Sequence, residues 1–164
     1  MSTQPQWPGS RAAVPSPVLG LAVWLRRVAG RHPARPALTC DEHTWTYAEL
    51  QRRVEAFSAV LAAHGVLHGD RFGYLGFNDP HFLVAMFASA RLNAIFVPLN
   101  FRLTGPEMAY ILGHAEVAAV IAGPEFCTTL DAVRGELALP AGRYVVLSQE
   151  APEGWTGYEA LMAS

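Results

Sequence analysis

Histidine and cysteine are the side chains in this sequence whose types could bind a metal ion or attack a substrate. His64 and His68 have the i, i+4 spacing that places two imidazoles on one face of a helix. Gly65 lies between them, however, and no third ligand follows at a useful spacing, which favours surface or capping histidines over a zinc site. Cys40 and Cys127 are far apart and have no activating neighbour, which indicates two reduced thiols rather than a disulfide or a nucleophile.

Phosphate and acyl chemistry usually depend on short glycine-rich or serine-centred motifs, and the sequence has none of them. It contains neither G-x-G-x-x-G nor G-x-x-x-x-G-K followed by Ser or Thr, and it lacks the G-x-S-x-G elbow of serine hydrolases. Gly73 and Gly76 lie in an apolar run, where we expect them to permit close backbone packing. Asp70 follows Gly69 and is expected to be a turn residue rather than a base. These residues by themselves predict no local catalytic set.

The composition indicates one packed domain. The chain has 164 residues, of which 51% are hydrophobic, and its 12 Lys and Arg are scattered, which argues against a nucleic-acid surface. Near the N-terminus, Pro15 and Pro17 interrupt an apolar stretch that is too short to span a bilayer, and the pattern of a signal peptide is absent. We interpret residues 1–17 as a flexible leader, and we expect a cytoplasmic protein without a transmembrane segment.

The elements that must position any site alternate along the chain. Two T-x-x-E sequences, Thr46 to Glu49 and Thr104 to Glu107, predict capping boxes at the starts of two helices. A first helix is expected at 18–31 and a hairpin at 37–40 and 43–46. Further strands are expected at 71–77, 94–97, 117–122 and 144–147, and further helices at 46–64, 80–92, 104–113, 124–137 and 158–162. This alternation predicts an α/β fold: a parallel sheet with right-handed crossovers and flanking helices.

In such a sheet, ligands usually bind beyond the carboxyl ends of the strands. The loops at that edge are expected at residues 78–80, 98–103, 123–125 and 148–152. Asn93 precedes one strand, at a helix exit where a positive φ is expected. The strand at 117–122 is entirely apolar, so we expect it to need cover on both faces.

A set of short motifs resembles a known family when it is taken in order. The set comprises Thr46-Tyr47-x-Glu49-Leu50, Gly65-Val66, Gly69-Asp70-Arg71, Asn78, the helix exit at 91–94, Pro98-Leu99-Asn100 and Thr104-x-x-Glu107. It resembles the N-terminal region of the AMP-forming acyl-CoA synthetases, which belong to the adenylate-forming superfamily with luciferases and adenylation domains. The resemblance covers residues 18–164, and it implies an incomplete part of the large N-terminal domain of these enzymes.

The resemblance implies a reaction in two halves. ATP and Mg²⁺ serve the adenylation of a carboxylic acid, a fatty acid above all, and CoA then displaces AMP to form a thioester. The family's phosphate loop, metal motif and catalytic lysine are absent from this sequence, which stops before the phosphate loop. We therefore expect no catalytic residue here, no tight cofactor binding and no activity of this chain alone. Pro98, Leu99, Asn100 and Phe101 would line the tunnel for the pantetheine arm of CoA, or would form only a turn that positions the next helix.

Two other functions stay open at this point. The chain could be a non-catalytic binding or interaction protein derived from this family. It could also be part of an adenylation enzyme that loads a carrier protein. A parallel sheet without its remaining strands exposes an edge and apolar faces, and the strand at 117–122 needs cover on both faces. We therefore also expect self-association or association with the missing C-terminal part.

Overall fold

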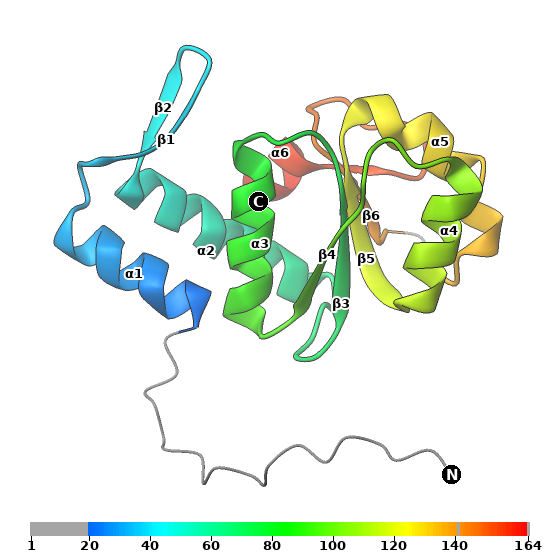
Figure 1. Ribbon diagram of the computed structural model, residues 1–164, viewed down its shortest axis with the longest axis horizontal. Coiled ribbons are helices and arrows are strands. Elements are labelled where there is room, and N and C mark those ends of the chain that lie inside the picture. Colours follow the sequence, from blue (N-terminus) through cyan, green and yellow to red (C-terminus); the bar gives the residue numbers. More distant parts are fainter. Residues whose placement is uncertain (1–19, 141, 164) are drawn as a thin grey trace, which may run out of the picture.

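A five-stranded parallel sheet lies at the centre of the computed structural model, which describes residues 20–140 and 142–163 (Figure 1). Neighbouring strands are hydrogen-bonded in the order β4-β3-β5-β6-β7, and every pair is parallel. The strands are β3 (Arg71–Leu75), β4 (Ile95–Pro98), β5 (Val117–Ala122), β6 (Tyr144–Val146) and β7 (Thr156–Gly157). This arrangement confirms the predicted α/β class with flanking helices. The expected leader at 1–17 lies outside the described residues.

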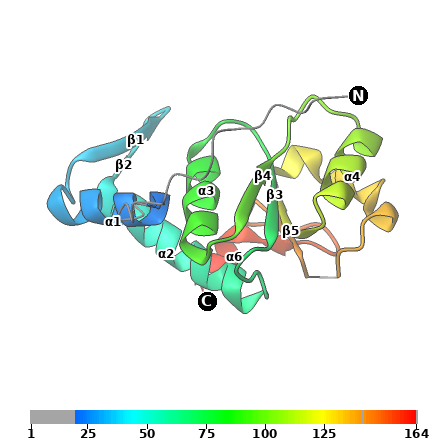
Figure 2. The same ribbon diagram turned by 60° about the horizontal axis from the view of Figure 1, so that its bottom comes forward.

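Helices cover both faces of the sheet because alternate side chains of each strand point in opposite directions. On one face, Phe72 and Ile121 share a core with α1 (Leu21–Arg31), α2 (Tyr47–Ala63) and α3 (Pro80–Leu92). On the other face, Leu75 and Val120 share a core with α4 (Gly105–His114) and the short α5 (Cys127–Asp131). Figure 2 shows these two layers with the strands between them. The last helix, α6 (Tyr158–Ala163), lies on the α2 side, where Tyr158 packs against Phe57.

The strand order creates a point at which neighbouring crossovers diverge. From β3 the chain passes through α3 to β4, and from β4 it passes through α4, on the opposite face, to the far side of β3. The loops after β3 and β5 therefore leave the carboxyl edge of the sheet toward different layers. Open α/β sheets bind their ligands at this kind of switch point.

Specific side chains set the starts and ends of the helices, as the sequence predicts. The backbone N–H of Thr46 donates to the Glu49 carboxylate at 2.7 Å, and that of Thr104 donates to Glu107 at 2.8 Å. Both predicted capping boxes are therefore confirmed. Asn93 ends α3 with a φ of 54°, which confirms the expected positive φ.

Polar contacts join the starts of the strands at the amino-terminal end of the sheet. The Asp70 carboxylate accepts the backbone N–H of Leu67 at 2.7 Å, so Asp70 is a turn residue as predicted. The backbone C=O of Asp70 accepts the N–H of Ile95 at 2.7 Å. The Arg71 Nε donates to the backbone oxygen of Ala115 at 2.6 Å, and its guanidinium also pairs with Glu116. These contacts tie the starts of β3, β4 and β5 together.

Gly73 of β3 packs against Leu112 of α4 and Val120 of β5. A Cβ added at this position would lie 2.9 Å from Leu112 Cδ2 and 3.1 Å from Val120 Cγ2. Both neighbours are buried, so neither could move away without disturbing the core. This geometry confirms that Gly73 permits close packing.

In the later part of the chain, one sequence prediction is wrong and one strand was missed. The helix expected at 124–137 is broken into a 3₁₀ turn (Pro124–Phe126), α5 and a second 3₁₀ turn (Arg134–Glu136). At the break, the Arg134 guanidinium stacks 4.0 Å from the Tyr144 ring and lies 3.1 Å from Asp131. The short strand β7 was not predicted at all.

The apolar strand β5 has the cover on both faces that it was expected to need. It pairs with β3 on one side and β6 on the other, and it lies inside the sheet. All of its side chains are buried except that of Ala118, which is half-buried. Cover on both faces comes from this chain itself, so β5 gives no reason to expect self-association.

Candidate functional site

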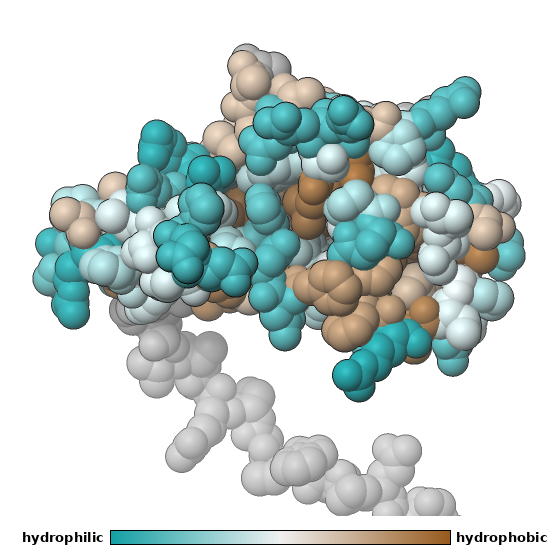
Figure 3. Space-filling model, turned by 90° about the horizontal axis from the view of Figure 1, so that it is seen from above, coloured by the Kyte–Doolittle hydropathy of each residue, from teal (hydrophilic) through white to brown (hydrophobic). Residues whose placement is uncertain are grey.

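Three phenylalanine rings meet at the carboxyl end of the sheet. Phe77 follows β3, Phe101 follows β4 and Phe126 follows β5. The centroid of the Phe77 ring is 5.0 Å from that of Phe101 and 5.3 Å from that of Phe126. Phe77 and Phe101 are 50% and 39% exposed, so this aromatic cluster is open to solvent. Figure 3 shows this end of the molecule from above, where hydrophobic surface lies among polar side chains.

The four residues predicted as a tunnel wall have different environments. Pro98 is the last residue of β4, paired with Tyr74. The backbone N–H of Leu99 donates to the backbone oxygen of Tyr74 at 2.8 Å. The Leu99 side chain is buried in the core that includes α4. The Asn100 side chain accepts the backbone N–H of Arg102 at 3.0 Å, and so it stabilises the turn itself. Of the four, Phe101 presents its ring to the aromatic cluster.

The turn is rigid for these reasons, and its outer surface combines apolar and cationic character. Leu99 anchors it in the core, and Asn100 fixes the backbone on its exposed side. The Arg102 guanidinium lies 5.5 Å from the Phe101 ring centroid, within the range of a cation–π contact. The arrangement could bind an extended apolar chain that carries an anionic end.

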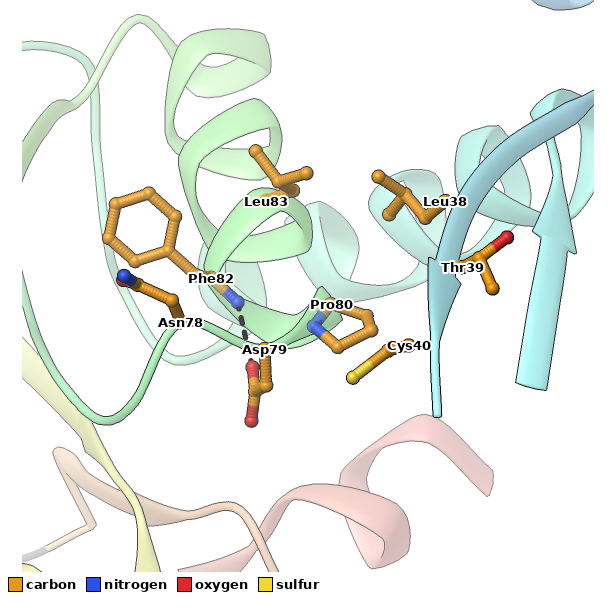
Figure 4. A pocket seen from close by; sticks show the side chains of 8 residues that line it. All are labelled: Leu38, Thr39, Cys40, Asn78, Asp79, Pro80, Phe82 and Leu83. Atoms are coloured by element: carbon orange, nitrogen blue, oxygen red, sulfur yellow. Dashed lines mark hydrogen bonds between the residues drawn. The ribbon is translucent and has the colours of Figure 1, made fainter. Parts of the chain in front are cut away.

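A separate pocket of about 330 Å³ opens between the hairpin and α3 (Figure 4). The hairpin consists of β1 (Pro36–Cys40) and β2 (His43–Thr46), paired antiparallel. It contributes one wall, and the β3–α3 turn with the first turn of α3 contributes the other. The lining residues are Leu38, Thr39, Cys40, Asn78, Asp79, Pro80, Phe82 and Leu83. This pocket is mostly apolar and includes the predicted loop at 78–80.

Asp79 is the ionisable carboxylate at this pocket. Its Oδ1 caps α3 by accepting the backbone N–H groups of His81 at 2.8 Å and Phe82 at 3.2 Å. The same oxygen accepts the Tyr74 hydroxyl at 3.1 Å. Partial burial by itself raises the pKa of Asp79, but the His81 side chain and the Phe82 N–H outweigh it, so the net pKa lies below its ordinary value. Asp79 is therefore a carboxylate at neutral pH.

Neither histidines nor cysteines assemble a catalytic group in the described chain. Among the residues that the structure describes, no three His, Cys, Asp or Glu side chains are placed to hold a metal ion. The His64 ring instead bonds the backbone oxygen of Val60 at 2.9 Å. Cys127 is buried, and burial raises the pKa of its thiol to about 11. Cys40 is a half-buried free thiol in the wall of the pocket.

Sequence reasoning missed both the aromatic cluster and the pocket between hairpin and helix. The cluster had a signal, because one predicted strand ends at Phe77 and two others are followed within a few residues by Phe101 and Phe126. The pocket had none, since it depends on how the hairpin lies against α3. Within residues 20–140 and 142–163, no helix is long and apolar enough to cross a membrane.

Known proteins are similar to this chain in both sequence and fold. The family model described as AMP-binding enzyme matches residues 25–161. An indoleacetate–CoA ligase of Aromatoleum aromaticum is 39% identical over 87% of this chain and 27% of its own length. A long-chain-fatty-acid–CoA ligase of Thermus thermophilus is 40% identical over 74% of this chain and 22% of its own length.

The solved structures agree on the fold. The structure of an anthranilate CoA ligase in complex with anthranoyl-AMP superimposes with a TM-score of 0.83 at 23% identity, over 88% of this chain and 28% of that one. This chain thus spans between a fifth and a third of the length of these relatives. It belongs to the AMP-binding enzyme family and corresponds to the N-terminal region of its AMP-forming acyl-CoA synthetases.

Proposed function

We propose that this chain supplies the N-terminal part of an ATP-dependent carboxylate–CoA ligase. The relatives are named for the CoA ligation of indoleacetate and long-chain fatty acids, which suggests an apolar carboxylic acid as substrate. The observation that carries the proposal is the aromatic cluster at the switch point of the sheet, where this fold class binds its ligands.

Pro98, Leu99, Asn100 and Phe101 are proposed as one wall of the path for the pantetheine arm of CoA. That arm is a narrow chain with apolar segments, and the exposed rings of Phe77 and Phe101 offer a matching surface. The buried Leu99 side chain and the Asn100 turn hold this wall in place. CoA, when bound, supplies the thiol that becomes the thioester.

The residues described here do not fit the triphosphate of ATP. The loop after β5 carries Gly123, but a Cβ at that position would lie 2.7 Å from the Glu125 carboxylate, so an acidic group fills the space next to the backbone. A carboxylate in this place would repel phosphate. We therefore assign the binding of ATP and Mg²⁺ to other parts of the AMP-binding domain. On this proposal, the chain alone binds no cofactor tightly and is inactive.

An exchange assay tests the proposal. ATP–pyrophosphate exchange should be absent for this chain with indoleacetate, benzoate or a long-chain fatty acid. Exchange should appear when the chain is mixed with a protein that comprises the remaining part of the AMP-binding domain. Exchange by the chain alone would refute its dependence on the remaining part. No exchange on mixing, despite a stable complex, would favour the non-catalytic interaction protein.

The role of the turn is tested in the reconstituted enzyme. Phe101→Ala should raise the KM for CoA in thioester formation and leave pyrophosphate exchange unchanged, because on this proposal the ring lines the CoA path and takes no part in adenylation. Tyr110→Ala is the matched control, since Tyr110 is an exposed aromatic residue on α4 outside the cluster. A Phe101→Ala enzyme with an unchanged KM for CoA would leave the turn with a structural role only.

Three further expectations belong to this proposal. The acceptor is CoA rather than a carrier protein, and thioester formation with each acceptor distinguishes the two. The location is the cytoplasm, which microscopy of the tagged protein tests. Association with the remaining domain is favoured over self-association because β5 is already covered, and light scattering of the chain alone tests this point.

A further inference from the structure

A pocket of about 280 Å³ opens between α2 and α6, on the face of the sheet opposite α4. Its lining consists of two arginines, one alanine and one methionine: Arg52, Arg53 and Ala56 of α2, and Met162 of α6. None of these residues belongs to the aromatic cluster or to the turn at 98–101. The pocket is therefore separate from the wall proposed for the CoA path.

The Arg53 side chain is held in place by aromatic neighbours. Its guanidinium carbon lies 4.3 Å from the centroid of the Trp45 ring, which is a cation–π contact. Burial raises the pKa of Tyr158 on α6 to about 12, and the charge of the nearby Arg53 acts against this rise. A stacked guanidinium keeps its N–H groups at its edge, where they can donate to an anion. Arg52 is exposed beside it.

Neither arginine of the pocket is neutralised by an ion pair among the residues that the structure describes. The field of both arginines reaches Glu49, one turn earlier on α2. The Oε2 of Glu49, however, accepts the backbone N–H and the hydroxyl of Thr46 at 2.7 and 3.0 Å. Glu55 accepts the Gln51 amide at 2.8 Å and pairs with Arg91. Two cations without ion pairs thus line a pocket that has no acidic side chain in its lining.

We propose that this pocket binds a phosphate monoester with a small apolar substituent. The guanidinium groups of Arg52 and Arg53 donate to the phosphate oxygens, and the substituent lies against Ala56 and Met162. Guanidinium groups match the geometry of phosphate, and two adjacent cations attract a dianion more strongly than a carboxylate. The volume lies just below the usual range of small-molecule sites, which limits the substituent to about one ring. The inference does not rest on the proposed ligase function, because it uses none of the residues assigned to that function.

Isothermal titration calorimetry of this chain tests the choice of ligand. Phenyl phosphate should bind more tightly than inorganic phosphate or benzoate, and phenol should not bind. Raising sodium chloride from about 0.05 M to about 0.5 M should weaken the binding of phenyl phosphate, because salt screens the attraction of exposed charges. Binding of phenol as tight as that of phenyl phosphate, or no binding of phenyl phosphate, would overturn the proposal.

Two sources could supply such a group, a free metabolite or the 3′-phosphate of CoA. Competition against phenyl phosphate distinguishes them. Displacement by CoA but not by dephospho-CoA assigns the site to the phosphate monoester of CoA, and displacement by neither assigns it to a free phosphate monoester. Displacement by both would contradict the preference for a monoester, because dephospho-CoA has none.

Substitutions in the pocket separate the charge from the apolar wall. Arg52→Gln should weaken phenyl phosphate binding about three- to tenfold through the loss of one charge-assisted contact at an exposed site. The matched control is Arg35→Gln, since Arg35 is an exposed arginine before β1 and outside the pocket. Met162→Ser should reduce the advantage of phenyl phosphate over inorganic phosphate. Unchanged affinity in Arg52→Gln, or an equal loss in Arg35→Gln, would refute binding at this pocket.

Discussion

The two ends of the parallel sheet are built from different contacts. At the amino end, backbone and side-chain hydrogen bonds of Asp70 and Arg71 join the starts of three strands. At the carboxyl end, the same three strands lead to phenylalanine rings that touch one another and remain open to solvent.

The difference indicates that contacts at the amino end mainly stabilise the fold, whereas those at the carboxyl end offer a surface for binding. Hydrogen bonds at the amino end fix the register of the strands, and substitutions there should change the free energy of unfolding. Rings at the carboxyl end contribute less to folding because Phe77 and Phe101 keep 50% and 39% of their surface in water. That exposed surface is available to a ligand, which agrees with the rule that parallel sheets bind at their carboxyl ends.

The largest effect is expected from Arg71→Ala at the amino end. It removes the bond to the Ala115 oxygen and the ion pair with Glu116, and it should lower the free energy of unfolding by about 1.5–3 kcal/mol. Urea unfolding followed by circular dichroism measures the loss. Arg102→Ala, an exposed arginine at the carboxyl end, is the control and should change stability by less than about 0.5 kcal/mol. Equal losses at the two positions would erase the contrast between the ends.

A smaller effect is expected from the aromatic cluster. A double-mutant cycle with Phe77→Ala and Phe101→Ala should give a coupling of about 0.5–1.5 kcal/mol, as for other edge-to-face aromatic pairs. The same cycle with Phe77→Ala and Tyr110→Ala should give none. A coupling of several kcal/mol would mean that the cluster holds the fold together as firmly as the amino end does.

Asn93→Gly, also at the amino end, is expected to change the free energy of unfolding in the opposite direction to Arg71→Ala. Its φ of 54° suits glycine better than asparagine, so the substitution should be neutral or should raise the free energy of unfolding by up to about 1 kcal/mol. Asn78→Gly, at the carboxyl end and without a positive φ, should be slightly destabilising. A clear loss of thermal stability in Asn93→Gly would reveal a role for its side chain at the amino end.

The smallest expected effect is on the pH dependence of thermal stability in acid. The folded-state pKa of Asp79 lies below its unfolded value of 3.8, so its contribution to stability is complete above that value and is lost as the pH falls through the folded pKa. Below pH 4, wild-type thermal stability should therefore fall more steeply than that of Asp79→Asn. Parallel curves for the two proteins would show that the capping bonds do not depend on the charge.

Sequence patterns predicted the elements whose signals are local. Thr46, Thr104 and Asn93 each specify a helix boundary through a contact or a backbone angle within a few residues. The helix predicted at 124–137 is broken near Arg134, whose guanidinium stacks on Tyr144 of strand β6. A pattern in one segment carries no information about such a partner.

The candidate site was predicted only in part, for the same reason. Phe101 was identified as a site residue from the resemblance, but its ring partners Phe77 and Phe126 belong to loops from other strands. Their meeting depends on the strand order, which places β3 between β4 and β5. Alternation of strands and helices predicts a parallel sheet without specifying that order.

The strand order also determines when the sheet can form during synthesis. β3 pairs with β4, which follows it after one helix, but it also pairs with β5, which leaves the ribosome later. Until then, the free edge of β3 and its buried Leu75 lack their partners. Because pairings distant in sequence form slowly, the unfinished edge should be the part of the nascent chain that chaperones recognise longest.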